Sequence, residues 1–201
     1  MSDQAKNPGR EVSRQTLAAG RVLNLQAIRW RDATGTERVW EMAARNGDHR
    51  AVLLIAWLQP SDRLVLVSQY RPPANGTVIE FPAGLIDGSE TSDEAARREL
   101  WEETGYRGRV VRCFPASYNT PGLSSERTHV AMVEIDETSL ENQHAMPHPD
   151  EAEEIDVVLV SRTEIADFLA RAETAGVQFD SKVISYLIAL ISAPDPVSAQ
   201  R

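Results

Sequence analysis

The segment from Gly84 to Tyr106 constrains the fold of this chain more than any other part of its sequence. A turn containing two glycines comes first, and Thr91 and Glu94 then have the spacing of a capping box at a helix N-terminus. A helical pattern continues from there until Gly105, a residue type that commonly ends helices. The sequence therefore predicts one helix over residues 91–104, with a turn on each side.

Three glutamates near the end of this helix are predicted to share one face. At about 100° per residue, Glu103 lies about 40° and Glu102 about −60° from Glu99, so the carboxylates span an arc of about 100°. Arg98 precedes Glu102 by four residues and can bridge to it. Converging carboxylates repel one another unless a cation joins them, and Mg²⁺ prefers oxygen ligands. The alternative is a solvated acidic helix face, the usual meaning of such a cluster.

Composition narrows the class of protein. The chain has 201 residues, of which 42% are hydrophobic and 25% charged, and its formal net charge is −9. An acidic surface disfavours nucleic acid, whose phosphates require neutralisation. No run approaches the roughly 18 apolar residues of a membrane span, and the first residues lack the apolar segment of a secretory signal. With Cys113 as the single cysteine, we expect a cytoplasmic protein that binds neither nucleic acid nor membrane.

Hydrophobic patterns divide the chain into a small extension and one larger domain. Strand-like runs cover residues 21–30, 37–45, 51–59, 63–70, 77–81, 109–114, 128–135 and 155–160, and helical patterns cover 91–104, 161–174 and 181–191. We expect a disordered tail (1–14), an N-terminal β extension (15–50), an α/β domain (51–192) and a frayed tail (193–201). This order predicts an α/β sandwich with a mixed sheet, preceded by a small antiparallel extension.

The segment Gly84–Tyr106 resembles the motif of the Nudix hydrolases, G-x5-E-x7-R-E-U-x-E-E-x-G-U. It matches at every polar and glycine position and differs only by Tyr106, where an aliphatic residue is usual. The resemblance implies the Nudix fold, an α/β/α sandwich in which the motif forms a metal-binding loop–helix–loop. It makes Glu99 and Glu103 the main Mg²⁺ ligands and Glu102 a further ligand, with Mn²⁺ as a possible substitute.

The same resemblance assigns three supporting roles. Ala83 contributes its backbone carbonyl to a metal, and Glu90 and Arg98 form the pair that orients the metal-binding glutamates. The histidines do not compete for this role, because His129, His144 and His148 do not have the spacing of metal ligands. His144 and His148 lie in a Pro-containing loop, where we expect them to face solvent.

Segments outside the motif resemble the ADP-ribose and ADP-sugar pyrophosphatase branch of the Nudix hydrolases. They are Trp40–Arg45, Gln69–Pro73, Glu80–Ile86 and Thr120–Arg127, the last of which contains Pro121. The resemblance implies that Trp40 stacks on the base and that Arg45 and Arg71 contact the phosphates. The alternatives are a core tryptophan and ordinary loop arginines. Some relatives hold adenine between two tryptophans, and Val22 falls near the position of the second.

The catalytic base of this branch is a glutamate on a loop before a late strand. Glu153 fits this description best, with Glu151 and Glu154 as neighbours in the same loop, and Glu126 beyond Pro121 is a rival. A base must come within hydrogen-bond reach of the attacking water.

Together these features predict the hydrolysis of a nucleoside diphosphate sugar, with ADP-ribose giving AMP and ribose 5-phosphate. The branch also suggests a homodimer in which residues 20–50 reach the partner and help to form its adenine site. Other substrates stay open: a different NDP-sugar, an oxidised nucleoside diphosphate or a capped nucleotide. A non-catalytic nucleotide sensor is a further alternative.

Overall fold

The computed structural model describes residues 9–47, 50–148 and 154–193, and these fall into two units. The first unit contains the chain up to Arg50 together with Ala116–Thr128, and the second contains the rest. None of the helices in the described part of the chain is long and apolar enough to cross a membrane.

A three-stranded antiparallel sheet forms the first unit. Its strands are β1 (Arg10–Ala19), β2 (Leu23–Arg31) and β3 (Glu37–Arg45), in the order β1-β2-β3. Residues 10–14 therefore belong to a strand, whereas the sequence predicted a disordered tail through residue 14. All five side chains are exposed and Val12 is the one apolar residue among them, so no hydrophobic alternation marks the segment, and the order comes from backbone pairing with β2.

The segment Ala116–Thr128 joins this unit through the end of β3. The Ala43 amide donates to the Leu123 carbonyl at 2.9 Å, and Ala43 and Ser124 form an isolated parallel bridge. The sequence did not predict this pairing, because the two partners lie about eighty positions apart and residues 123–124 have no strand pattern.

An eight-stranded mixed sheet forms the centre of the second unit. The main path runs β11-β6-β5-β4-β9-β8, with β10 paired to β5 and β7 to β4. The strands are β4 (Arg50–Gln59), β5 (Arg63–Arg71), β6 (Gly76–Glu80), β7 (Ala83–Ile86), β8 (Arg109–Tyr118), β9 (Arg127–Asp136), β10 (Ile155–Ser161) and β11 (Gln178–Phe179). The parallel pair β11–β6 beside antiparallel pairs such as β4–β5 makes the sheet mixed, as predicted.

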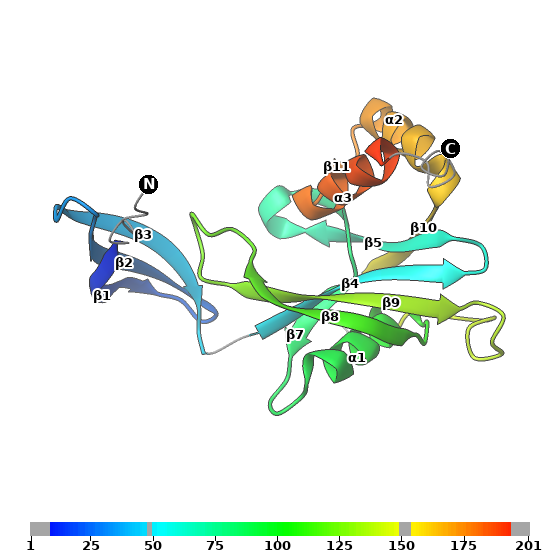
Figure 1. Ribbon diagram of the computed structural model, residues 1–201, viewed down its shortest axis with the longest axis horizontal. Helices are drawn as coiled ribbons and strands as arrows, with labels where there is room; N and C mark the ends of the chain where they lie inside the picture. The colour runs from blue at the N-terminus through cyan, green and yellow to red at the C-terminus, as the bar shows by residue number, and fades with distance from the viewer. Residues whose placement is uncertain (1–8, 48–49, 149–153, 194–201) are drawn as a thin grey trace, which may run out of the picture. The chain divides into compact units, whose positions relative to one another are not determined.

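Helices cover both faces of this sheet. Helix α1 (Ser92–Thr104) lies on one face, and α2 (Ile165–Ala175) and α3 (Ser181–Ser192) lie on the other (Figure 1). The described residues also contain two short 3₁₀ turns, η1 (Pro72–Ala74) and η2 (Arg162–Glu164). The arrangement confirms the predicted α/β/α sandwich.

Strand β4 separates the two hydrophobic cores. Its alternate residues, such as Leu54 and Leu58, pack in the core that includes Leu100 of α1. Leu53 and Trp57 point the other way, into the core with Leu187 of α3. A strand buried on both faces reads as an unbroken hydrophobic run, which is how residues 51–58 appear in the sequence.

The start of the second helix differs from the prediction. Ser161 and Glu164 have capping-box spacing, but the Ser161 side chain makes no cap hydrogen bond and its hydroxyl instead lies 3.0 Å from that of Thr163. A 3₁₀ turn occupies residues 162–164, and α2 begins only at Ile165. Strands β7 and β11 were also not predicted, because runs of four and two residues are too short to show a period.

Candidate active site

Helix α1 begins and ends where its sequence predicts. The Thr91 hydroxyl accepts from the Glu94 amide at 3.2 Å, and the Glu94 carboxylate accepts from the Thr91 amide at 2.8 Å, which completes a capping box. Gly105 ends the helix with φ 74°, in the left-handed region that favours glycine. The glutamates of the motif are therefore carried on a helix fixed at both termini.

Arg98 is the centre of the polar contacts on this helix. Its Nε and Nη2 donate to the two carboxylate oxygens of Glu90 at 3.0 and 2.9 Å, a bidentate pair. Its Nη1 donates to Glu99 at 2.8 Å and to Glu102 at 2.9 Å. Nη2 also reaches the Leu85 carbonyl at 2.8 Å. The predicted bridge from Arg98 to Glu102 is therefore present, and the same guanidinium also ties the helix to the turn before it.

The ion pair between Arg98 and Glu90 shifts the pKa of both side chains. Hydrogen bonds from Arg98 hold the pKa of the Glu90 carboxyl below its ordinary value, against the opposing effect of burial. The pKa of the Arg98 guanidinium is raised, chiefly by its hydrogen bonds to Glu90 and then by those to Glu99 and Glu102. The ion pair between Glu90 and Arg98 thus favours the charged form of both side chains.

Glu99 and Glu103 lie against β7 with little exposure, 8% and 6% respectively. The Ala83 amide donates to a carboxylate oxygen of Glu103 at 3.0 Å. A Cβ added to Gly84 would overlap the carboxylate of Glu99, so only glycine allows the strand to approach the helix this closely. The structure thus brings Ala83, Gly84, Glu99 and Glu103 together, as the sequence motif implied.

The donor atoms at this site suit a hard divalent cation. Within residues 9–47, 50–148 and 154–193, no three acidic, histidine or cysteine side chains already surround one coordination point. Glu99, Glu102 and Glu103 nevertheless present only oxygen donors. Arg98 donates to Glu99 and Glu102, and the Ala83 amide donates to Glu103, so each of these carboxylates is held in place by at least one donor. Mg²⁺ and Mn²⁺ both accept such ligands.

Arg71, predicted to contact phosphate, lies at the end of β5 and is held by a partner that the sequence did not indicate. Its Nε donates to the Glu80 carboxylate at 2.8 Å, and its Nη2 lies 2.6 Å from the same oxygen. The Arg71 side chain is 44% exposed, so part of the guanidinium stays open to a ligand. Two residues earlier on β5, Gln69 pairs with Ile155, the first residue of β10.

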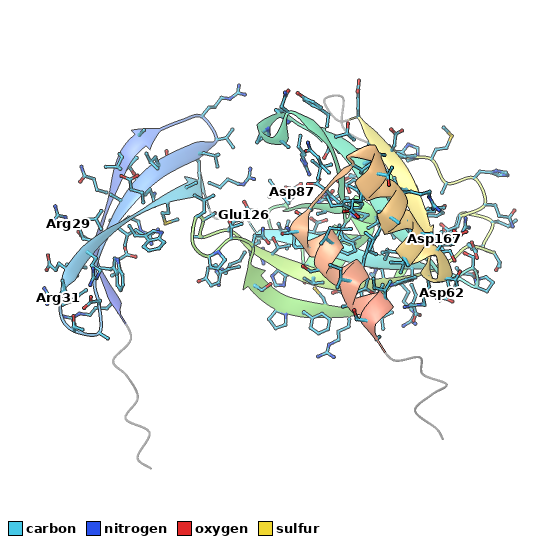
Figure 2. All side chains as sticks on the ribbon, turned by 90° about the horizontal axis from the view of Figure 1, so that it is seen from above. Arg29, Arg31, Asp62, Asp87, Glu126 and Asp167 are labelled. Atoms are coloured by element: carbon cyan, nitrogen blue, oxygen red, sulfur yellow. The ribbon has the colours of Figure 1, made fainter. Side chains whose placement is uncertain are left out.

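The other two predicted substrate contacts lie in the first unit. The Trp40 indole is 51% exposed, and its Nε1 donates to the Gly122 carbonyl at 3.0 Å. Trp40 is therefore not a core tryptophan. The Arg45 guanidinium reaches Glu126 at 3.5 Å, and Glu126 also accepts from the Asn119 side-chain amide at 2.9 Å. Figure 2 shows Glu126 on the segment between β8 and β9 that belongs to this unit.

Val22 falls near the expected position of a second stacking tryptophan, and the structure shows which residues lie around it. Val22 is 48% exposed and lies in the turn before β2, where its carbonyl accepts from Asn46. Trp40 pairs with Ile28 across the strands, and Trp30 pairs with Arg38. Trp30 and Trp40 are therefore diagonal neighbours on one face of the sheet, a relation that strand periodicity alone could not reveal.

Two of the predicted catalytic bases, Glu153 and Glu151, lie outside the described residues. Glu154 lies just before β10 and is exposed. The rival Glu126 is described, and hydrogen bonds from Arg45 and Asn119 engage its carboxylate.

Comparisons with known proteins place this geometry in a family. The model of the NUDIX domain matches residues 47–186. The chain is 35% identical over 197 residues to the ADP-sugar pyrophosphatase of Mus musculus, covering 92% of this chain and 89% of the relative. It is 34% identical over 169 residues to the ADP-ribose pyrophosphatase of Saccharomyces cerevisiae, covering 80% and 73%. A crystal structure of an ADP compounds hydrolase has the same fold, with a TM-score of 0.68, 21% identity and 94% coverage of both chains.

The ion pair between Glu90 and Arg98 predicts a pH-dependent contribution to stability. Because the pKa of Glu90 is lower in the folded than in the unfolded chain, its stabilisation is complete above the unfolded pKa of about 4.3 and is lost as the pH falls through the folded pKa. In metal-free buffer, Glu90→Gln should lower the free energy of unfolding by about 2 kcal/mol at pH 7. The loss should shrink toward zero under acid conditions, as measured by urea unfolding across a pH series.

The matched control is Glu37→Gln, which removes the exposed ion pair of Glu37 with Arg31. An exposed pair of this kind contributes at most about 1 kcal/mol, so this variant should change the free energy of unfolding little at any pH. Equal losses in the two variants would contradict a special role for the Glu90–Arg98 pair.

Proposed function

The chain belongs to the Nudix family, and on that premise we propose that it hydrolyses the pyrophosphate bond of a nucleoside diphosphate sugar. The proposed substrate is ADP-ribose, cleaved to AMP and ribose 5-phosphate. The observation that carries the proposal is the cluster of three glutamates on α1. Arg98 donates to Glu99 and Glu102, Glu99 lies against the Gly84 backbone, and Glu103 accepts from the Ala83 amide. The relatives named as ADP-sugar and ADP-ribose pyrophosphatases support the choice of substrate.

Mg²⁺ is the proposed cofactor, with Mn²⁺ as a substitute. Glu99 and Glu103 would hold it, with Glu102 and the Ala83 carbonyl as further ligands. When bound, the cation neutralises charge on the pyrophosphate and lowers the pKa of water. Arg98 keeps Glu99 and Glu102 in place, since its guanidinium donates to both carboxylates.

Substrate recognition is assigned to three side chains. Trp40 offers a half-exposed indole whose orientation is fixed by the hydrogen bond to Gly122, which suits stacking on a base. Arg45 and Arg71 are each held by a carboxylate, Glu126 and Glu80, and such a partner orients a guanidinium for bidentate phosphate contacts.

We assign the general base to Glu153, which would deprotonate the attacking water. The hydrogen bonds of Glu126 support a different role for that rival, because its carboxylate already serves Arg45 and Asn119. Glu151 and Glu154 are the remaining alternatives in the loop before β10.

A homodimer is the proposed assembly, with residues 20–50 contacting the partner. The first unit exposes many large apolar side chains: Val12, Leu17, Val22, Leu23, Leu25, Val39 and Trp40. Charge also favours self-association. Residues 1–50 contain nine basic and six acidic residues, whereas the rest contains 12 and 24, so the two parts carry net charges of +3 and −12.

A cytoplasmic location is proposed from the single cysteine.

The metal assignment predicts the effect of two substitutions. Glu99→Gln and Glu103→Gln should each lower kcat/KM for ADP-ribose in Mg²⁺ by more than about 100-fold, since loss of even an indirect metal contact costs 10- to 100-fold. Release of AMP measured by chromatography checks this, with Glu94→Gln, in the first turn of α1, as the control. Near wild-type turnover in both variants would rule out the assignment, and binding of ADP-ribose without turnover by the wild type would indicate a sensor.

The base assignment predicts a contrast between two glutamates. Glu153→Gln should lower kcat about 10²- to 10⁴-fold with little change in KM, because the base acts only in the chemical step. Glu126→Gln should mainly raise KM, since it loosens Arg45. Steady-state kinetics with ADP-ribose separates the two, and the reverse pattern would make Glu126 the base.

The dimer predicts a mass of about twice 22.3 kDa by light scattering at micromolar concentration. Leu25→Asp and Val39→Asp place charge on exposed apolar positions of the first sheet and should shift the mass toward that of one chain. Leu140→Asp, at an 84% exposed leucine of the second unit, is the control and should leave the mass unchanged. A wild-type protein that scatters as a monomer would contradict the proposal.

A further inference from the structure

The last turn of α1 is electrostatically unfavourable. It carries Glu102 and Glu103 and no basic residue. The C-terminal end of a helix already bears a partial negative charge from its unpaired carbonyls, so acidic side chains there promote fraying. The turn that holds two proposed metal ligands therefore needs stabilisation from outside the helix.

Contacts at the C-terminus of α1 supply this stabilisation. The Thr104 hydroxyl donates to the Leu100 carbonyl, and the Gly105 amide donates to the Trp101 carbonyl at 2.8 Å. The Glu102 carbonyl accepts from the His148 amide at 2.6 Å. The His148 amide comes from a loop far along the chain. It caps the carbonyl of Glu102, whose side chain is a proposed metal ligand.

A stacked aromatic pair holds this loop on the helix. The rings of Trp101 and His148 have centroids 4.4 Å apart and an interplanar angle of 24°. The guanidinium of Arg107 lies 5.4 Å from the centroid of the Trp101 ring. His148 was predicted to face solvent, and although the residue is exposed, its ring packs on Trp101. Trp101 occupies the position between Leu100 and Glu102 that the Nudix motif leaves unspecified.

Two further contacts fix the same loop. Asn142 is 6% exposed, and its side chain bonds to the amide and carbonyl of Arg107 and to the carbonyl of Asp136. A Cβ on Gly105 would collide with the backbone of Met146, so glycine is needed there for close approach as well as for its positive φ. Residues 142–148 therefore form a cap held on α1 at several points.

We propose that Trp101 and His148 are positioning residues for metal binding. Their stack keeps the His148 amide on the Glu102 carbonyl and so keeps the turn with Glu102 and Glu103 helical. The inference rests on the proposed function, since it takes these glutamates as metal ligands. Neither side chain touches the metal or the substrate in this role.

The expected effect follows from a local equilibrium. If the last turn of α1 frays, the glutamates leave their binding geometry, and the apparent dissociation constant rises in inverse proportion to the folded fraction of that turn. Loss of the stack should therefore weaken metal affinity without abolishing it. At limiting metal, kcat should therefore fall. KM for ADP-ribose should change little, because the substrate contact through Arg71 should be unaffected.

The experiment measures metal binding directly and without substrate. Mn²⁺ is titrated into the full-length protein, and free Mn²⁺ is followed by electron paramagnetic resonance. We expect His148→Ala and Trp101→Leu to raise the Kd for Mn²⁺ about three- to tenfold, consistent with the strength of a stacked aromatic pair. His148→Phe restores a ring and should recover most of the affinity. His144→Ala removes an exposed histidine of the same loop and should match the wild type.

The outcomes separate the inference from the proposed function. If the wild type does not bind Mn²⁺, or if Glu99→Gln binds as tightly as the wild type, the proposed metal site itself fails. If the wild type binds but His148→Ala has the same Kd, the positioning role is overturned. Thermal melting accompanies each titration. Should Trp101→Leu unfold, His148→Ala decides the question, because the substituted residue is exposed and its backbone amide remains.

Discussion

The hydrogen bonds of the Arg98 guanidinium are the interaction on which the geometry of the site depends. One side chain joins the Leu85 carbonyl of β7 and the Glu90 carboxylate of the following turn to Glu99 and Glu102 on successive turns of α1. Acidic groups so close together would otherwise repel one another, and a planar guanidinium with several fixed donors can bind them all at once. Lysine could not replace it, because an ammonium group lacks this fork of donors.

The sheet gives this cluster a rigid support. Strand β4 buries side chains on both faces, so α1 packs on one core while α2 and α3 pack on the other. Strand β7 pairs with β4 and carries Ala83 and Gly84 against the helix. The Gly84 backbone lies close to the Glu99 carboxylate because of this packing, since buried residues such as Leu100 hold α1 against the sheet.

Residues outside the helix depend on contacts over long sequence distances. Trp40 and Arg45 are held by the segment 116–128, through Gly122 and Glu126, and both partners lie about eighty residues further along the chain. Trp101 and His148 connect α1 to a later loop in the same way. Trp40, Arg45 and Trp101 thus each have a distant partner that fixes the orientation of the side chain.

The sequence alone determined helix α1, its limits and the common face of its glutamates. These properties are local: the capping residues, the glycine stop and the 3.6-residue period are set within one element. It also identified the family motif and the layered α/β fold, because hydrophobic periods reveal which elements are buried. Only the tertiary structure decided the partners: Glu80 for Arg71, Glu126 for Arg45, His148 for Trp101, and the order in residues 10–14. The spacing of these residues in the sequence follows neither the helical nor the strand period. Packing and backbone pairing, rather than local preference, therefore select the contacts.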